Sequence, residues 1–347
     1  MNRMQAVGER KATVLQAVVQ DYIRTGEPVG SGSIARRYRL GVSPATIRSE
    51  MAALEEMGFL AQPHTSAGRI PTDHGYRFYV DHLPRRLTLS RGIGRQIASF
   101  YADPVPDVDD LLQGTAALLS RLTGYAAVAL TPRLSRSRVL RAELVPVGSS
   151  VMLLVVSDTG RVDKRVLDLG AEPAAEIVER ASQLLSERLT GLSYDEASRR
   201  AASLARQIAE EERRLVRDVA AALAELRDPQ AEHVYVGGVA NIADEDAFQR
   251  RETLRELVET LEERSAVLEV LEAALDALGD VSVRIGRENS LRALAEASLV
   301  VAWYEAQERP AGAIAVVGPT RMAYPRAIST AQAVAGRLSE LMSGFAG

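Results

Sequence analysis

The 347-residue chain contains no cysteine, which excludes disulfide bonds, thiolate metal sites and cysteine nucleophiles. Its four histidines supply few groups for acid–base chemistry at neutral pH, and no nucleophile–base pair occurs in a recognisable motif. No apolar run approaches ~20 residues, and the N-terminus lacks an apolar segment that would direct secretion. We therefore expect a cytoplasmic protein that is not an enzyme, needs no cofactor and binds no metal.

Lysine is also scarce, since Lys11 and Lys164 are the only two and arginine carries the remaining positive charge. This bias is most simply a trait of a GC-rich genome, although arginine also forms bidentate contacts to phosphate or guanine. The net charge of -4 is unevenly distributed. Residues 1–91 carry 13 Lys and Arg against 8 Asp and Glu, whereas the remainder carries 29 against 38. A basic head on an acidic body is typical of a DNA-binding domain attached to a sensing or oligomerising body.

Residues 43–54 have the pattern of a recognition helix. Ser43 is a natural N-cap, and Pro44 follows at the first helical position, where its missing N–H costs nothing. Three apolar residues at i, i+4 and i+7 predict a buried stripe: Ile47, Met51 and Leu54. Small and basic residues are left on the open side near the N-terminus, and a helix-turn-helix presents such a face to the major groove.

The flanking segments predict the remainder of a winged helix-turn-helix. Residues 9–25 have helical apolar spacing, residues 33–39 form a short helix, and residues 40–42 are the tight turn before the recognition helix. Residues 59–61 and 69–70 are expected as short strands around a wing at 62–68. A further helix then begins at the cap Thr72 and runs to about His82.

We expect ten residues to contact DNA: Ser43, Pro44, Thr46, Arg48 and Ser49 at the recognition helix, Arg36 and Arg37 on the preceding helix, and His64, Thr65 and Arg69 at the wing. Ser43 can also touch a phosphate, because a helix N-terminus favours anions. The small pair Ala67 and Gly68 would allow close backbone approach to a phosphate or the minor groove. Two alternatives stay open: Arg36 and Arg37 form a solvated basic face, or His64 only caps the hairpin.

The body alternates helices and strands. A linker with a short helix near 93–101 is expected at 85–106, followed by a helix at 107–122 and a strand at 125–130. A three-stranded meander is expected at 139–147, 151–157 and 161–167, with helices at 176–189 and about 195–226. The expected elements after it are a strand at 233–237, a helix at about 247–278, strands at 281–285, 299–304 and 312–317, and a last helix after Pro325.

This order predicts an α+β chain. The strands before Pro132 and after His233 would share one central antiparallel sheet, and residues 135–230 would be an insertion. Segments 284–289 and 318–321 lack the spacing of a nucleotide-binding loop. We therefore expect Gly286 and Gly318 to be turn residues, and Arg321 to have a structural or surface role.

Several motifs resemble the HrcA family of heat-inducible transcription repressors over essentially the whole chain. They are Pro28-Val29-Gly30-Ser31, Val42-Ser43-Pro44-Ala45-Thr46-Ile47-Arg48, Leu54-Glu55-Glu56-Met57-Gly58, Pro63-His64-Thr65-Ser66-Ala67-Gly68-Arg69-Ile70-Pro71-Thr72, Gly75-Tyr76-Arg77-Phe78-Tyr79-Val80, Gly237-Gly238, Arg284-Ile285-Gly286-Arg287-Glu288-Asn289 and Gly318-Pro319-Thr320-Arg321-Met322-Ala323-Tyr324. The family usually has Asn where this chain has Ser49, so a bidentate contact to adenine there would be lost.

The resemblance implies a winged-helix DNA-binding domain at 1–84, a linker at 85–106 and a GAF-like domain formed by 107–134 and 231–347. An inserted dimerisation domain would occupy 135–230. It further implies a homodimer that represses chaperonin and co-chaperone operons through an inverted-repeat operator on double-stranded DNA, with chaperonin maintaining the active fold and heat removing activity. Two rival functions are a metabolite-sensing regulator, whose GAF-like body binds a ligand, and a catalytic body fused to a DNA-binding head.

Overall fold

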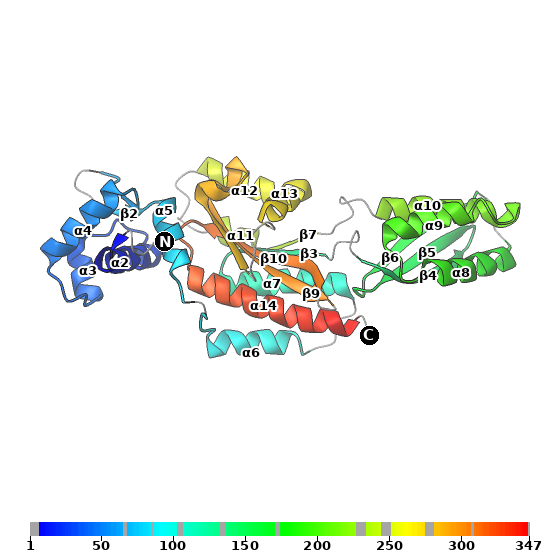
Figure 1. Cartoon of the computed structure of the whole chain (residues 1–347), viewed down its shortest axis with the longest axis horizontal. Helices are drawn as coiled ribbons and strands as arrows, with labels where there is room; N and C mark the ends of the chain where they lie inside the picture. The colour runs from blue at the N-terminus through cyan, green and yellow to red at the C-terminus, as the bar shows by residue number, and fades with distance from the viewer. Residues whose placement is uncertain are drawn as a thin grey trace.

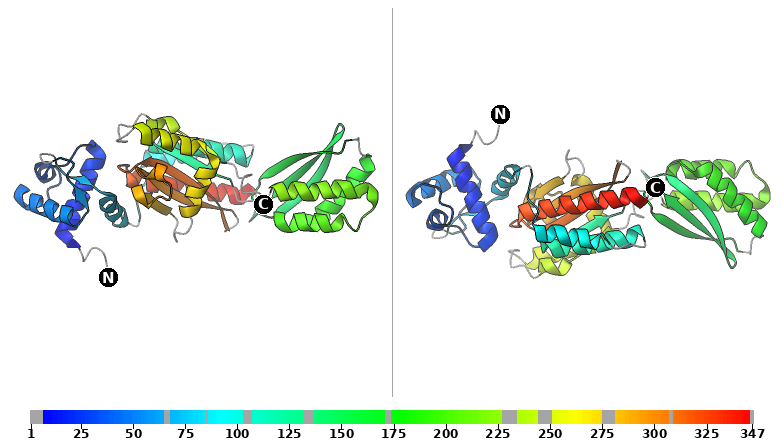
Figure 2. Two further views of the ribbon diagram at one scale, coloured as in Figure 1. Left: turned by 90° about the horizontal axis from the view of Figure 1, so that it is seen from above. Right: turned by 90° about the horizontal axis from the view of Figure 1, so that it is seen from below.

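The computed structural model describes residues 7–64, 68–84, 86–102, 107–131, 137–170, 174–226, 234–243, 251–274, 281–306 and 309–345. These residues form an elongated molecule with three units in a row (Figure 1). A mainly helical head lies at one end, a five-stranded sheet with its helices in the middle, and a three-stranded sheet with its helices at the other end (Figure 2). No helix in these ranges is both long and apolar enough to cross a membrane.

The head is built from α2 (Glu9–Thr25), α3 (Ser31–Arg37), α4 (Pro44–Glu56), β1 (Leu60–Ala61), β2 (Ile70–Pro71) and α5 (Asp73–Asp81). The predicted buried stripe of α4 is confirmed, since Ile47, Met51 and Leu54 are all buried. They pack with Leu15 of α2 and Ile34 of α3 in one hydrophobic cluster. The expected short helix at 33–39 begins two residues earlier and ends at Arg37.

The middle unit contains a five-stranded antiparallel sheet in the order β7-β3-β10-β9-β8. Its strands are β3 (Ala126–Leu130), β7 (Val234–Gly237), β8 (Val281–Ile285), β9 (Ala297–Ala306) and β10 (Arg309–Pro319). The predicted strands are present, with β9 and β10 extending beyond the expected spans. Strand β3 pairs with β7 across the intervening segment, with Leu130 opposite Val234.

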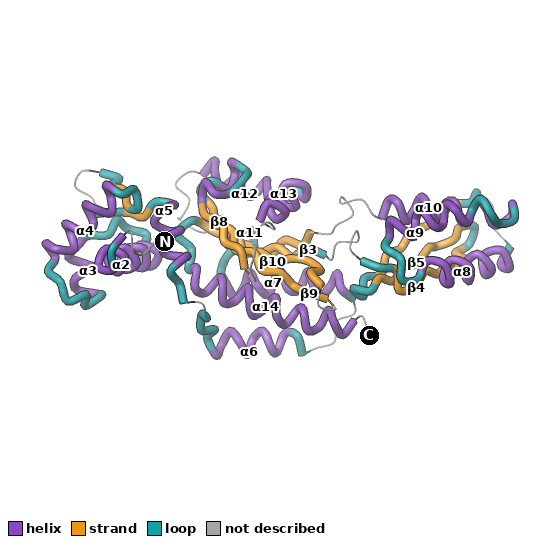
Figure 3. The backbone as a smooth tube through the Cα atoms, in the orientation of Figure 1, coloured by secondary structure: helices purple, strands orange, loops and turns teal. Residues whose placement is uncertain are grey.

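Helices cover both faces of this sheet (Figure 3). One face packs against α7 (Val108–Thr123) and α14 (Tyr324–Phe345), and α6 (Arg91–Phe100) lies against α14. The other face packs against α11 (Val239–Ala243), α12 (Arg251–Glu262) and α13 (Arg264–Ala274). The alternation of buried residues along the strands therefore serves two separate apolar layers.

The third unit is a meander of β4 (Val139–Val147), β5 (Ser150–Ser157) and β6 (Val162–Asp168) with three helices on one face. These helices are α8 (Ala175–Leu189), α9 (Tyr194–Leu204) and α10 (Glu210–Leu226). A separate hydrophobic cluster holds this unit together. The predicted meander is confirmed to within one residue at the ends of each strand. Gly148 and Gly160 adopt the positive φ angles of the tight turns that separate the strands.

The prediction of two long helices is wrong, because each of the two segments forms a pair of shorter helices. The segment 195–226 breaks after Leu204, and the segment 247–278 breaks at Glu263. A straight helix of about 32 residues would be about 48 Å long at 1.5 Å per residue. Strands of five to eleven residues are only about 17–36 Å long, so a single helix would overhang the sheet. When the segment forms two shorter helices instead, both helices can bury their apolar residues.

The segment expected as a linker contains the short helix predicted near 93–101, which is α6. Ser90 caps the helix by accepting from the Ile93 N–H at 3.2 Å. Ile97 and Tyr101 are buried, and the Tyr101 hydroxyl hydrogen-bonds to Thr115 Oγ1 of α7 at 2.9 Å. Burial raises the pKa of Tyr101 to about 12, while the bond to Thr115 opposes this rise. The segment is thus packed onto the middle unit.

Candidate nucleic-acid interface

The start of α4 presents a capped and open helix end. Ser43 Oγ accepts from the Thr46 N–H at 3.1 Å and lies 3.0 Å from the Thr46 hydroxyl. Ser43, Pro44, Arg48 and Ser49 are exposed, whereas Thr46 is half-buried. The open side of the helix therefore carries small polar groups and the Arg48 guanidinium, which has no partner among the described residues, and its orphan N–H groups favour an anion.

A buried carboxylate that the sequence analysis did not identify anchors α4 to α2. Glu50 is 6% exposed and accepts from Arg10 Nε at 2.6 Å, with Lys11 Nζ at 3.3 Å. Burial would raise the pKa of Glu50, but the hydrogen bonds and charges of Arg10 and Lys11 hold it below its usual range. Helix α4 is thus oriented from its inner side by an ion pair as well as by apolar packing.

The two arginines expected on α3 have different environments. Arg37 donates from Nη1 to both carboxylate oxygens of buried Asp21, at 2.7 and 2.9 Å, and Arg24 binds the same carboxylate at 2.5 Å. Arg36 is exposed and forms no ion pair with any described residue. Arg37 therefore holds α3 to α2, and Arg36 is the one with a free guanidinium.

Arg39 was not among the residues expected to contact DNA. It lies in the turn between α3 and α4, with a positive φ of 35° that is unusual for a residue with a side chain. Arg39 is exposed and, within the described part of the chain, unpaired, as is Arg48. The unpaired Arg36, Arg39 and Arg48 therefore belong to α3, the turn and α4, which lie at the end of the head away from the sheets (Figure 1).

Strands β1 and β2, at the base of the predicted wing, are fixed to the rest of the head. Strands β1 and β2 pair with Leu60 opposite Pro71 and Ala61 opposite Ile70. Arg69 donates from Nε to Glu55 of α4 at 2.6 Å, and its backbone exchanges hydrogen bonds with Val29 at 2.8 and 2.9 Å. Arg69 is half-buried, and its ion pair with Glu55 fixes the base of the predicted wing to α4. His64 is exposed, and Thr65 lies outside the described residues, as do Ser66 and Ala67.

The close backbone approach permitted by Gly68 is internal. A Cβ at Gly68 would lie 2.4 Å from the carbonyl oxygen of Val29, so only glycine fits there. Our expectation that this glycine admits a phosphate is replaced by a packing role at the wing base. The histidines also have packing roles: His74 lies edge-on to Phe59, and His82 stacks on Phe78. The described residues hold no cluster of three or more metal-ligating side chains.

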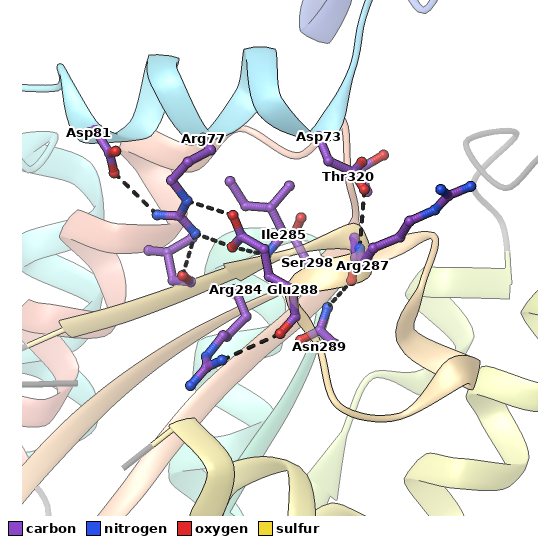
Figure 4. A network of polar contacts seen from close by, with 12 residues as sticks. Asp73, Arg77, Asp81, Arg284, Ile285, Arg287, Glu288, Asn289, Ser298 and Thr320 are labelled. Atoms are coloured by element: carbon purple, nitrogen blue, oxygen red, sulfur yellow. Dashed lines mark hydrogen bonds and ion pairs between the residues drawn. The ribbon is translucent and has the colours of Figure 1, made fainter. Parts of the chain in front are cut away.

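The head is joined to the middle unit through α5 (Figure 4). Arg77 donates from Nε to Glu288 Oε1 at 2.8 Å, from Nη2 to Glu288 Oε2, and from Nη2 to the Val283 carbonyl at 2.6 Å. Asp73 accepts from the Arg287 backbone N–H at 3.1 Å. Its carboxylate stands where a Cβ of Gly286 would be, at 2.4 Å, and Gly286 has φ of +52°. We call this set of contacts the head–body seam.

Comparison with known proteins places these features in a family. Residues 109–328 match the model of the HrcA protein C terminal domain. The heat-inducible transcription repressor HrcA of Thermobifida fusca is 41% identical over 338 residues, covering 97% of each chain. That of Moorella thermoacetica is 39% identical, covering 96% of this chain and 97% of the relative. The crystal structure of a hypothetical protein has a similar fold, with a TM-score of 0.69, 24% identity, and coverage of 97% of this chain and 99% of that one.

Proposed function

The chain belongs to the HrcA family of heat-inducible transcription repressors, and from this premise we propose that it represses heat-shock genes by binding double-stranded DNA through its head. The head is then a winged helix-turn-helix, in which α4 enters the major groove and the wing follows the neighbouring backbone. The proposed DNA contacts remain Ser43, Pro44, Thr46, Arg48, Ser49, Arg36 and His64, together with Thr65. Arg37 and Arg69 would act by positioning α3 and the wing.

The observation that carries this proposal is the placement of unpaired arginines. Three acidic residues of the head are neutralised internally: Asp21 by Arg24 and Arg37, Glu50 by Arg10 and Lys11, and Glu55 by Arg69. Arg36, Arg39 and Arg48 keep their charges on the helix-turn-helix surface. A net positive face beside an open helix N-terminus suits a phosphate backbone.

We further propose that the protein acts as a homodimer and that the three-stranded unit is the dimerisation domain. The sheet face away from α8–α10 exposes large apolar side chains, namely Leu140, Val145, Val147, Val162 and Val166. Val145, Met152 and Val166 form one row across the three strands, and Glu143, Leu154 and Lys164 form the next. A second copy related by a two-fold axis can cover the apolar row and bring Glu143 opposite Lys164.

The family resemblance extends the proposal to regulation. The operator would be an inverted repeat upstream of chaperonin operons, because a two-fold dimer reads a two-fold site. Chaperonin would maintain the active fold, and heat would remove activity as chaperonin is drawn to other unfolded proteins. A marginally stable GAF-like body suffices for this, since ~1–2 kcal/mol of lost stability changes active abundance several-fold.

A gel-shift titration tests the proposal. The purified chain is titrated against a duplex with the chaperonin-operon inverted repeat and against a scrambled duplex, each with and without chaperonin. We expect specific binding that chaperonin strengthens. The Arg48→Ala variant should lose ~1–3 kcal/mol of binding energy if Arg48 reads a base.

The matched control is Arg255→Ala on α12, which removes an exposed arginine of the middle unit and should bind as the parent does. No preference for the repeat would contradict operator recognition. An equal loss on both duplexes in Arg48→Ala would make Arg48 a phosphate contact.

A further inference from the structure

A cavity of about 790 Å³ lies beside the head–body seam. The head contributes residues around the start of α5, among them Thr72, His74 and Tyr76. The body contributes the turns that follow β8 and β10, with Arg287, Thr320 and Arg321. The two segments expected from the sequence to be plain turns therefore meet the head at one hollow, whose size matches that of small-molecule sites.

Two guanidinium groups in the cavity wall lack a carboxylate partner among the described residues, those of Arg287 and Arg321. Asp73 is engaged by the Arg287 backbone, and the Arg287 side chain extends away from the Arg77–Glu288 contact (Figure 4). Arg321 lies over Gly26, with Nη1 3.1 Å from the position that a Cβ would take there. The other acidic residue of the wall, Glu296, forms an ion pair with neither arginine.

A buried donor without a partner lines the same cavity. Tyr76 is 2% exposed, and its hydroxyl makes no hydrogen bond to any described residue. A buried hydroxyl left without a partner destabilises the protein, and native structures contain few such groups. Burial also raises the pKa of Tyr76 well above its usual value, so the group remains a protonated donor at neutral pH.

We propose that this cavity binds a small phosphate monoester that carries hydroxyl groups. The phosphate would lie on Arg287 and Arg321, with the Tyr76 hydroxyl donating to the ligand, because guanidinium groups bind phosphate by charge-assisted hydrogen bonds. Glu296 would accept from a ligand hydroxyl, which accounts for an acidic group in a wall that otherwise suits an anion. Since the wall comes from both units, the ligand would hold head and body together. The inference does not depend on DNA binding.

Calorimetric titration of the full-length chain tests the site. Ribose 5-phosphate and inorganic phosphate are the probes, with chloride at matched ionic strength as the blank. We expect ribose 5-phosphate to bind, and Arg287→Gln and Arg321→Gln each to weaken its binding roughly tenfold or more. Arg292→Gln is the control, because Arg292 is exposed nearby on a short 3-10 helix (Arg292–Leu294) and does not line the cavity.

Binding of the ester above bare phosphate would support the hydroxyl contact, whereas equal binding of both probes would overturn it. No heat beyond the chloride blank, or equal weakening in Arg292→Gln, would overturn the site. The Arg321→Gln variant is first checked for an unchanged melting temperature, since Arg321 also lies at the C-terminal end of α2.

Tyr76→Phe gives a readout that a purely structural role would not produce. Removing an unpartnered hydroxyl should raise the melting temperature of the ligand-free protein and, at the same time, reduce the rise caused by ribose 5-phosphate. A lower ligand-free melting temperature, or an unchanged ligand-induced rise, would overturn the assignment of this hydroxyl.

Discussion

Arg77 and Glu288 are separated by 211 residues in the chain and form a bidentate ion pair between the head and the body. Both side chains are partly exposed, at 23% and 32%. Glu288 also accepts from the Ile285 N–H at 2.9 Å, which fixes the carboxylate from the body side. Burial alone would lower the pKa of Arg77, but the bonds and charge of Glu288 raise it above its usual value. The pair therefore links two units that otherwise have separate secondary structures.

Breaking this pair should loosen the head without unfolding either unit. Arg77→Ala is expected to lower the free energy of unfolding by ~1–2 kcal/mol, because a charge-assisted bidentate contact that is only partly exposed is lost. Urea unfolding measures the change, and a double-mutant cycle with Glu288→Ala isolates the pair. Arg255→Ala removes a fully exposed pair with Glu259 and should cause little change. Additive effects of the two seam mutations would contradict the coupling.

Arg36 and Arg37 should separate binding from stability. Arg36→Ala is expected to weaken operator binding and to leave unfolding unchanged, because its guanidinium has no described partner. Arg37→Ala should lower the free energy of unfolding by ~1–3 kcal/mol, because buried Asp21 keeps only Arg24. Urea unfolding and gel shifts on both variants measure the two effects. Equal stability losses in the two variants would refute this division.

The stabilisation that Glu50 provides should depend on pH. Its pKa is lowered in the folded chain, so its contribution is fully present above the ordinary value of about 4.5 and is lost as the pH falls through the lowered value. Glu50→Gln is expected to unfold more easily at pH 7, by ~1–2 kcal/mol. The difference from the parent should shrink below pH 4.5, which urea titrations at several pH values would measure. A difference that stays constant with pH would point to packing instead.

Val166→Glu should make the protein monomeric. Val166 on β6 is 67% exposed at one end of the apolar row, and a carboxylate there would be buried without a partner at the proposed dimer contact. Sedimentation analysis measures the oligomeric state. Gln183→Glu adds the same charge at an exposed position of α8, which covers the opposite face of the sheet. This variant should leave the oligomeric state unchanged. A Val166→Glu protein that remains dimeric would place the contact elsewhere.

The sequence predicted best where local chemistry determines structure. Ser43 and Pro44 define the start of α4 by capping and by the missing N–H of proline, and the apolar spacing after them identifies the buried side. Strand ends in the meander were equally clear, because glycine turns separate alternating residues. Such signals lie within a few residues of the feature that they specify.

The features that the sequence did not reveal depend on partners distant in the chain. Arginine is a residue type expected at DNA contacts, so the sequence indicated this role for Arg37 and Arg69. Their ion pairs with Asp21 and Glu55 form only when the helices pack. No proline or glycine marks the helix breaks after Leu204 and at Glu263 in the sequence. These breaks follow from the length of the sheet against which the helices pack. Arg321 was expected to have a structural or surface role, and no role was expected for Arg287, because only the fold brings both beside Tyr76.

The position of β3 in the middle sheet has a consequence for the newly made chain. All five residues of β3 are buried, and both of its neighbours, β7 and β10, come later in the sequence. At about 5–20 residues per second, the ribosome needs about 5–20 seconds to reach β7 and about 9–36 seconds to reach β10 after finishing β3. Until then an apolar strand has two open edges, which are sites for wrong pairing with other chains. The newly made chain therefore exposes this apolar strand for seconds before either of its neighbouring strands has been synthesised.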